Sequence, residues 1–446
     1  MKTNQFLSKL GPGILFASTA IGVSHLVQST RAGADYGLTL IVAILLANLF
    51  KFPFFDAGSR YARVTNTTLI DGYRSMGRWV FWLYIAITVA TMFFVMSAIT
   101  MVTAGFLGNL LQFVLPDSSI APNQIMIGVL CVPMIFLTFG GYVALDKVIK
   151  VIAFVLLSTT VISFILVLYH GPNTEASLFP DFNLQDEGKV LFLIGLMGWM
   201  PTAVDMSSWN SLWTLDKMKA RKEQGLSPLS LKEVITEFRF SYWISAFLSI
   251  CFVVLGAYVM YGSGVEFADS GAQFSGQVVQ LYTSVLGDWT WVIIALSGFS
   301  IMMGTTIGVM DGYARTFKTC LRILLLGYQD VSKTDVSEVA SQNNSLNNEE
   351  DKHPTLLWTY RGVLYILSLG VFIVVYQFGD SFKQLIDFTT GTSFLVAPVV
   401  AFMNIILIEK HIPEESQPSR VVKVLSYAGF FFLLGFAVYF VSIKFF

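Results

Sequence analysis

Apolar segments long enough to cross a bilayer recur along the whole chain of 446 residues. A membrane-spanning helix needs about 20 predominantly apolar residues, and eleven segments meet this criterion. None shows the alternation of apolar and polar residues that a spanning strand requires. The sequence therefore predicts an all-α polytopic membrane protein, with helices near 11–33, 38–62, 79–112, 123–140, 147–170, 188–214, 240–262, 289–312, 357–378, 386–408 and 423–443.

The composition excludes several classes of protein. Hydrophobic residues make up 54% of the chain and charged residues 13%, whereas a soluble domain has about 25% charged residues. The formal net charge is -1, so the basic surface of a nucleic-acid binder is absent. No nucleophile–base pair or cluster of metal ligands marks an enzyme, and no bound cofactor is expected.

The distribution of Lys and Arg predicts the orientation. With a cytoplasmic N-terminus, 23 of the 28 cations lie on the inner side, and only Arg31, Lys189, Lys383 and Lys444 lie outside, with Lys51 inside the second helix. Such a bias is typical of cytoplasmic loops. We expect a multi-pass protein of the bacterial inner (plasma) membrane with its C-terminus outside.

The helices form a single transmembrane transporter domain in this interpretation. A first repeat covers about 11–170, a second repeat covers about 188–408, and an extra helix covers about 423–443. The polar segment 327–355 is expected to be a mobile cytoplasmic loop. Segment 262–288 contains no Lys or Arg and is expected to be external, with a short helix.

Two helices contain residues that interrupt a helix near their middle. The first has Gly22, and the sixth has Gly198 and Pro201. Proline removes a backbone donor and obstructs the carbonyl four residues earlier. Each interruption falls in the first helix of a five-helix half, which is typical of inverted-repeat transporters with a site at the bilayer midplane. The alternative is that Pro201 only kinks its helix and Gly22 only permits close packing.

Several short motifs resemble those of the Nramp family of divalent-metal transporters, within the LeuT-type superfamily. The resemblance covers the first ten helices and is strongest over 11–72. It implies a LeuT-like 5+5 inverted repeat plus an eleventh helix, with the first and sixth helices broken at mid-membrane. The residues that carry it are GPG at 11–13, AGA at 32–34, Asn48, Arg60, Met200-Pro201, Met310-Asp311-Gly312-Tyr313 and Pro398.

The chain departs from the family pattern at the positions that bind metal. Where the family has Asp-Pro-Gly-Asn, this chain has residues 22–25, Gly-Val-Ser-His. Thr202 replaces the histidine of the sixth-helix motif, and Gly391 replaces a tenth-helix glutamine. Residues 79–115 hold no Asp, Glu or Lys, so the acidic residues that the family associates with proton movement are missing from the third helix.

Three side chains near the breaks are candidate metal ligands. His25 could ligate through neutral imidazole, Met200 through its thioether, and Asp205 through a carboxylate one turn beyond Pro201. The alternatives are a hydrogen-bonded structural histidine, a gap-filling methionine and a vestibule or capping carboxylate. The predicted substrate site consists of these three residues and of further residues at the two helix interruptions. It comprises Ile21, Gly22, His25, Met197, Met200 and Asp205.

A possible sodium site involves Thr305 and Thr306. The resemblance to sodium symporters of the LeuT type implies that paired hydroxyls here face the unwound first helix. With carbonyl oxygens around Ala20 and Val23 they would form a cage of hard oxygen ligands. Ordinary packing by small polar residues is the alternative.

Charged residues within the helices have different predicted roles. Asp56 and Arg60 are spaced for an i,i+4 ion pair, as are Asp311 and Arg315. Lys51 has no acid at i±3 or i±4 and lies too deep to reach water easily. It is a possible intramembrane charge that either pairs with an acid from another helix, for which Asp205 is the candidate, or occupies a cation site.

The sequence leaves three functions open. The leading hypothesis is a secondary-active metal-cation transporter that uses alternating access, with a non-standard site. The alternatives are a Na⁺-coupled transporter of a small organic solute such as an amino acid, and a non-transporting sensor or receptor. The expected partners are the lipid bilayer and a small ion or solute, with Na⁺ or H⁺ as the possible coupling ion. The oligomeric state is not predicted.

Overall fold

The computed structural model describes residues 11–116, 120–264, 268, 270–328, 353–378 and 381–445. Residues 329–352, which form most of the predicted cytoplasmic loop, lie outside this range. Every secondary-structure element assigned in the described residues is a helix. The first half contains α2 (Pro12–Ala20), a π-helical segment η1 (Val23–Ser29), α3 (Thr30–Tyr36), α4 (Ile41–Thr65), α5 (Leu69–Met76), α6 (Arg78–Val114) and α7 (Pro122–His170).

The second half also begins with an interrupted helix, and the chain ends in α16. Its elements are α8 (Glu187–Gly198), η2 (Val204–Met206), α9 (Ser207–Glu223), α10 (Leu231–Val259), α11 (Gly271–Leu286), η3 (Asp288–Thr290), α12 (Trp291–Leu326), α14 (Pro354–Phe378), α15 (Phe382–His411), η4 (Glu414–Ser416) and α16 (Arg420–Phe445). The short helix expected within 262–288 is α11.

The predicted spans are confirmed. Within the described residues, nine helical stretches are long and apolar enough to cross a membrane. Two of them, Pro122–Phe139 and Ala144–His170, are parts of the single assigned helix α7. The interrupted pairs α2/α3 and α8/α9 account for the two remaining predicted spans, because each half is too short to be counted alone.

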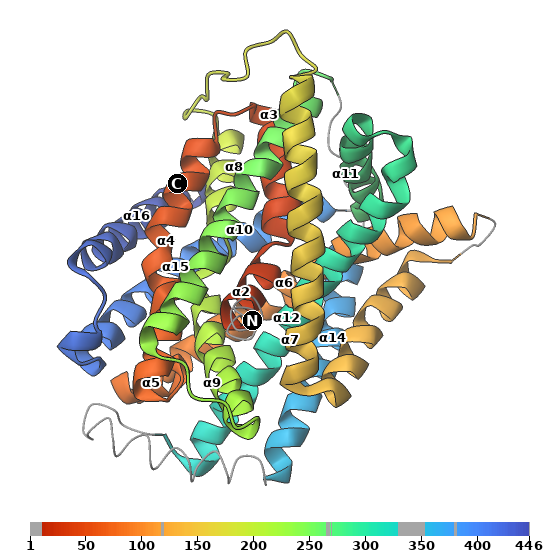
Figure 1. Ribbon diagram of the computed structural model, residues 1–446. Coiled ribbons are helices and arrows are strands. Elements are labelled where there is room, and N and C mark those ends of the chain that lie inside the picture. The colour runs from red at the N-terminus through yellow and green to blue at the C-terminus, as the bar shows by residue number, and fades with distance from the viewer. Residues whose placement is uncertain are drawn as a thin grey trace.

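The helices differ in how much of their surface the protein covers. The most apolar windows of α12 and α10 are 72% and 67% buried, whereas those of α14 and α16 are each 17% buried. Figure 1 shows α2 at the centre of the molecule and α16 at its left edge. Exposed apolar side chains on the outer helices, such as Tyr376 and Val421, are suited to contact lipid.

The central helices approach one another through glycines. A Cβ atom on Gly33 of α3 would lie 2.0 Å from the Val253 carbonyl oxygen of α10, and one on Gly256 would lie 2.2 Å from the Thr30 carbonyl oxygen. Small residues permit such backbone contact, which is how helices associate without a hydrophobic driving force. This crossing fixes α3, and with it the C-terminal side of the first break, against α10.

Candidate functional site

The first helix is interrupted at the predicted residue. Helix α2 ends at Ala20, and the chain passes through Ile21 and Gly22 before the π-helical segment begins at Val23. A Cβ atom on Gly22 would lie 2.7 Å from both Oγ1 and Cγ2 of Thr305. Glycine is therefore needed here because α12 approaches the open backbone closely.

The sixth predicted helix is interrupted between Gly198 and Val204. Helix α8 ends at Gly198, and the following stretch contains a cis peptide bond between Met200 and Pro201. A Cβ atom on Gly198 would lie 2.4 Å from the Thr390 carbonyl oxygen, so α15 packs directly on the end of α8. The two interruptions meet, because the Ser24 hydroxyl donates to the Pro201 carbonyl oxygen at 3.1 Å.

A small cavity lies where the two interruptions face α6 and α12. Its volume is about 30 Å³, which suits a few water molecules or an ion rather than a large solute. Most of its polar side chains are hydroxyls or a carboxylate, and the Met206 thioether also lines it. The polar residues that line it are Thr19, Ser24, Thr202, Asp205, Thr305 and Tyr313.

Asp205 is the acidic residue of this cavity. It is 7% exposed and lies in η2, directly after the break. Among the described residues it forms no ion pair within 4.0 Å, whereas buried Asp56, Asp71 and Asp311 each have an arginine partner at 2.7 to 2.9 Å. A buried carboxylate without a close cation is costly, so Asp205 provides a position where a cation would be stabilised.

His25 does not line this cavity. Its Nδ1 atom lies 2.8 Å from the Ser24 hydroxyl, and its Nε2 atom lies 3.0 Å from both the carbonyl and the hydroxyl oxygen of Ser245 on α10. The imidazole is completely buried and both nitrogens have partners. In this arrangement His25 links the first interruption to α10, which matches the alternative of a hydrogen-bonded structural histidine.

Met200 is also separated from the cavity. It is completely buried and packs in a hydrophobic cluster with residues of α4, α8 and α15. The methionine that lines the cavity is Met206, whose sulfur accepts a hydrogen bond from the Thr202 hydroxyl. The structure therefore does not bring His25, Met200 and Asp205 together. Within the described residues, no three His, Cys, Asp or Glu side chains are grouped to hold a metal ion.

The paired threonines of α12 point in different directions. The Thr305 hydroxyl donates to the Ser18 carbonyl oxygen of α2 at 3.1 Å and lines the cavity with Ala20 and Val23. The Thr306 hydroxyl lies 3.0 Å from that of Thr103 on α6. Only one hydroxyl of the predicted sodium cage therefore faces the first interruption.

The Lys51 side chain reaches the other side of the second interruption. Its ammonium donates to the carbonyl oxygens of Met197 and Gly198, both at 2.7 Å, and of Thr202 at 3.2 Å. It attracts Asp205 electrostatically without an ion pair. Asp205 was the predicted partner of Lys51. The hydrogen-bond partners of its ammonium are instead backbone carbonyls, including that of Met197 from the predicted substrate site.

Three tryptophans, Trp199, Trp209 and Trp213, flank the second interruption, and they have different surroundings. Trp199 and Trp209 line the cavity, and the Trp209 ring packs edge-on against Tyr313 with 4.9 Å between centroids. The Trp213 indole instead donates to the Asp311 carboxylate at 2.9 Å.

The predicted i,i+4 ion pairs Asp56–Arg60 and Asp311–Arg315 are both formed.

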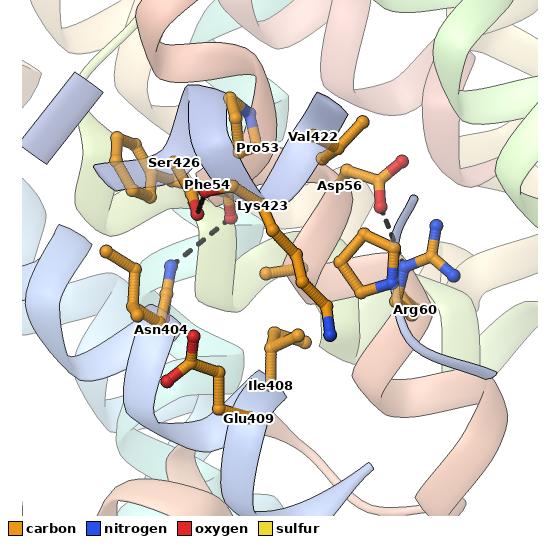
Figure 2. A pocket seen from close by; sticks show the side chains of 13 residues that line it. Pro53, Phe54, Asp56, Arg60, Asn404, Ile408, Glu409, Val422, Lys423 and Ser426 are labelled. Carbon is orange, nitrogen blue, oxygen red and sulfur yellow. Dashed lines mark hydrogen bonds and ion pairs between the residues drawn. The ribbon is translucent and has the colours of Figure 1, made fainter. Parts of the chain in front are cut away.

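A second pocket lies among α4, α15 and α16 (Figure 2). Its charged residues are already satisfied within the protein. Asp56 pairs with Arg60 at 2.9 Å and with Arg239 at 3.1 Å, and Glu409 accepts from the Tyr427 hydroxyl at 2.6 Å. This pocket lies where α15 and α16 pack against α4, and it is separate from the two helix interruptions.

Comparison with known proteins gives consistent results along the chain. The family model described as natural resistance-associated macrophage protein-like matches residues 13–442. An uncharacterized protein of Pasteurella multocida (strain Pm70) is 31% identical over 439 residues, which cover 97% of this chain and 92% of the relative.

Solved structures are similar in fold. A manganese transporter of Eremococcus coleocola superposes with a TM-score of 0.60 at 13% identity, covering 99% of this chain and 88% of that one. MhsT in complex with L-phenylalanine gives a TM-score of 0.61 at 12% identity, covering 97% and 98%. At these identities the similarity concerns the LeuT-like fold alone.

Proposed function

The chain belongs to the Nramp family, and on this premise we propose that it transports metal cations across the membrane by alternating access around the Asp205 cavity. The observation that carries the proposal is the position of Asp205: a buried carboxylate that lines the cavity between the two helix interruptions and lacks a close cationic partner. A cation bound beside it would supply the missing charge.

The chemistry of the cavity favours a small cation. Hydroxyl and carboxylate oxygens suit hard ions, and the Met206 thioether adds a softer donor. The family and the manganese transporter with the same fold make Mn²⁺ the first ion to test. The ligands proposed here are Asp205 and the hydroxyls of Thr202 and Thr305, while His25 is proposed to position the first interruption.

The experiment is uptake of Mn²⁺ into proteoliposomes by the wild type and by Asp205→Asn. This change removes the charge and keeps the shape, so we expect uptake to fall at least about tenfold, equivalent to about 1.4 kcal/mol. Asp186→Asn is the matched control, because Asp186 caps the exposed start of α8, and it should transport normally. Uptake by Asp205→Asn within about twofold of the wild type would contradict the assignment.

The coupling ion and the other two functions stay predictions. Replacing Na⁺ by K⁺, and collapsing the proton gradient, separates Na⁺ from H⁺ coupling in the same vesicles. The small cavity gives no specific support to an organic solute. A sensor would bind Mn²⁺ without any flux, which the uptake measurement detects directly.

A further inference from the structure

Lys51 is a cation buried in the middle of a predicted membrane span. The side chain is completely inaccessible, and α4 extends from Ile41 to Thr65 around it. Its Cα lies about 15 Å and about 21 Å along the axis from the two helix ends, at 1.5 Å per residue. A charge at that position is expensive and needs specific compensation.

The compensation comes from the broken end of α8. The carbonyls of Met197 and Gly198 belong to the last turn of this helix, where carbonyl groups lack the N–H partner of a regular helix; the Met197 carbonyl also accepts from the Met200 N–H at 3.4 Å. The end of a helix also carries a partial negative charge. With the Thr202 carbonyl beyond the break, these oxygens accept from the ammonium at 2.7, 2.7 and 3.2 Å, so each of its three donors has an acceptor.

The elements on both sides of the ammonium are attached to neighbouring helices. Gly198 packs against the Thr390 carbonyl oxygen of α15, as described above. Helix α4 itself is attached to α9, because the Asn210 amide donates to the Phe55 carbonyl oxygen at 3.3 Å. A Cβ atom on Gly58 would lie 2.2 Å from the Ser207 carbonyl oxygen. The three acceptors therefore form a cage around the ammonium, between elements that these contacts hold together.

A cage of carbonyl oxygens at a half-helix C-terminus is the kind of structure that coordinates a dissociable cation in transporters. Here the cage is filled by a side chain. We propose that the Lys51 ammonium is a covalently attached substitute cation that holds the interruption between α8 and η2 open, so that this position needs no ion from solution. The proposal concerns the structure of the interruption and is independent of which ion is transported.

Chemical rescue tests the proposal without any transport assay. Lys51→Ala removes the propylammonium portion of the side chain and leaves the cage empty. The apparent melting temperature of the purified variant is measured in detergent with n-propylammonium, ammonium, Na⁺ or K⁺, and with 1-propanol as the neutral control. We expect it to fall by at least about 5 °C and to recover with increasing n-propylammonium, as for a ligand of the folded state.

The wild type should not be stabilised by n-propylammonium, because its own ammonium already occupies the cage. A Lys51→Ala protein as stable as the wild type refutes the proposal, and so does a destabilised variant that the cations restore no better than 1-propanol.

If Lys51→Ala does not fold, two further variants give the answer. Lys51→Arg keeps the charge, whereas Lys51→Met keeps the approximate volume and removes it. A substitute cation requires Lys51→Arg to be the more stable and abundant of the two. Lys51→Met that equals or exceeds Lys51→Arg would show that the side chain acts by packing, and would overturn the proposal.

Discussion

The start of α2 is attached to the protein by one carboxylate, which allows a quantitative prediction. Glu237 of α10 accepts from the backbone N–H of Gly11 at 2.9 Å, of Gly13 at 3.0 Å and of Ile14 at 3.3 Å. These are the donors that a helix N-terminus leaves unpaired. Since α2 leads directly into the first interruption, we expect its attachment to limit local opening of α2.

The magnitude follows from these contacts. Hydrogen bonds to a charged acceptor contribute about 1.5–3 kcal/mol each, and a carboxylate at a partly buried helix N-terminus adds up to about 2 kcal/mol. Glu237→Gln keeps one acceptor oxygen and loses the charge. We expect the local opening of α2 to become easier by about 1.5–3 kcal/mol, which is roughly a 10- to 150-fold larger opening constant.

Amide hydrogen exchange measures this opening directly. In Glu237→Gln, amides of residues 13–20 should exchange roughly 10- to 150-fold faster, and amides of α16 should keep their wild-type rates. Glu233→Gln, which alters the surface cap at the start of α10, is the control. Exchange of α2 within about twofold of the wild type, or equal acceleration throughout the chain, would refute the reasoning.

Two further substitutions test the packing and the buried charges. Gly256→Ala must displace the Thr30 carbonyl oxygen and should lower stability by about 1–3 kcal/mol, measured as a lower melting temperature, whereas Gly435→Ala has open space around it and should not. Asp311→Asn removes the charge that pairs with Arg315 at 2.7 Å, while the pair of Arg315 with Asp216 remains, and should cost up to about 3 kcal/mol, measured as a lower melting temperature; an unchanged melting temperature would contradict this expectation.

The spans and interruptions were predictable because they depend on local properties of the sequence. Length and hydropathy locate a spanning helix, and Gly22 and Pro201 are visible as residues that a regular helix does not favour. The i,i+4 pair Asp56–Arg60 was predictable for the same reason, since both side chains belong to one helix. These features need no knowledge of how separate helices pack.

The candidate ligands were less predictable because they depend on rotation about the helix axis. Residues 23–29 form a π-helical segment, in which each turn takes more residues than in an α-helix. The side chains that follow Gly22 therefore face different neighbours from those expected of regular helix, and His25 meets Ser245 of α10. Met206 was overlooked because it lies in η2, after an irregular stretch that follows Met200 and that no periodicity describes.

The charges at the two interruptions support Asp205 as the residue on which the proposed transport depends. The first interruption is held by neutral groups, through His25 and Ser24, and the second by the carbonyl-bound ammonium of Lys51. Each of these groups has its hydrogen bonds satisfied within the protein. Asp205 faces the cavity with hydrogen bonds from its own backbone N–H and that of Met206 and an electrostatic attraction to Lys51, but among the described residues it has no ion pair within 4.0 Å. A cation that binds there gains a carboxylate and also meets the repulsion of Lys51, so its affinity reflects the difference between these two interactions rather than the carboxylate alone.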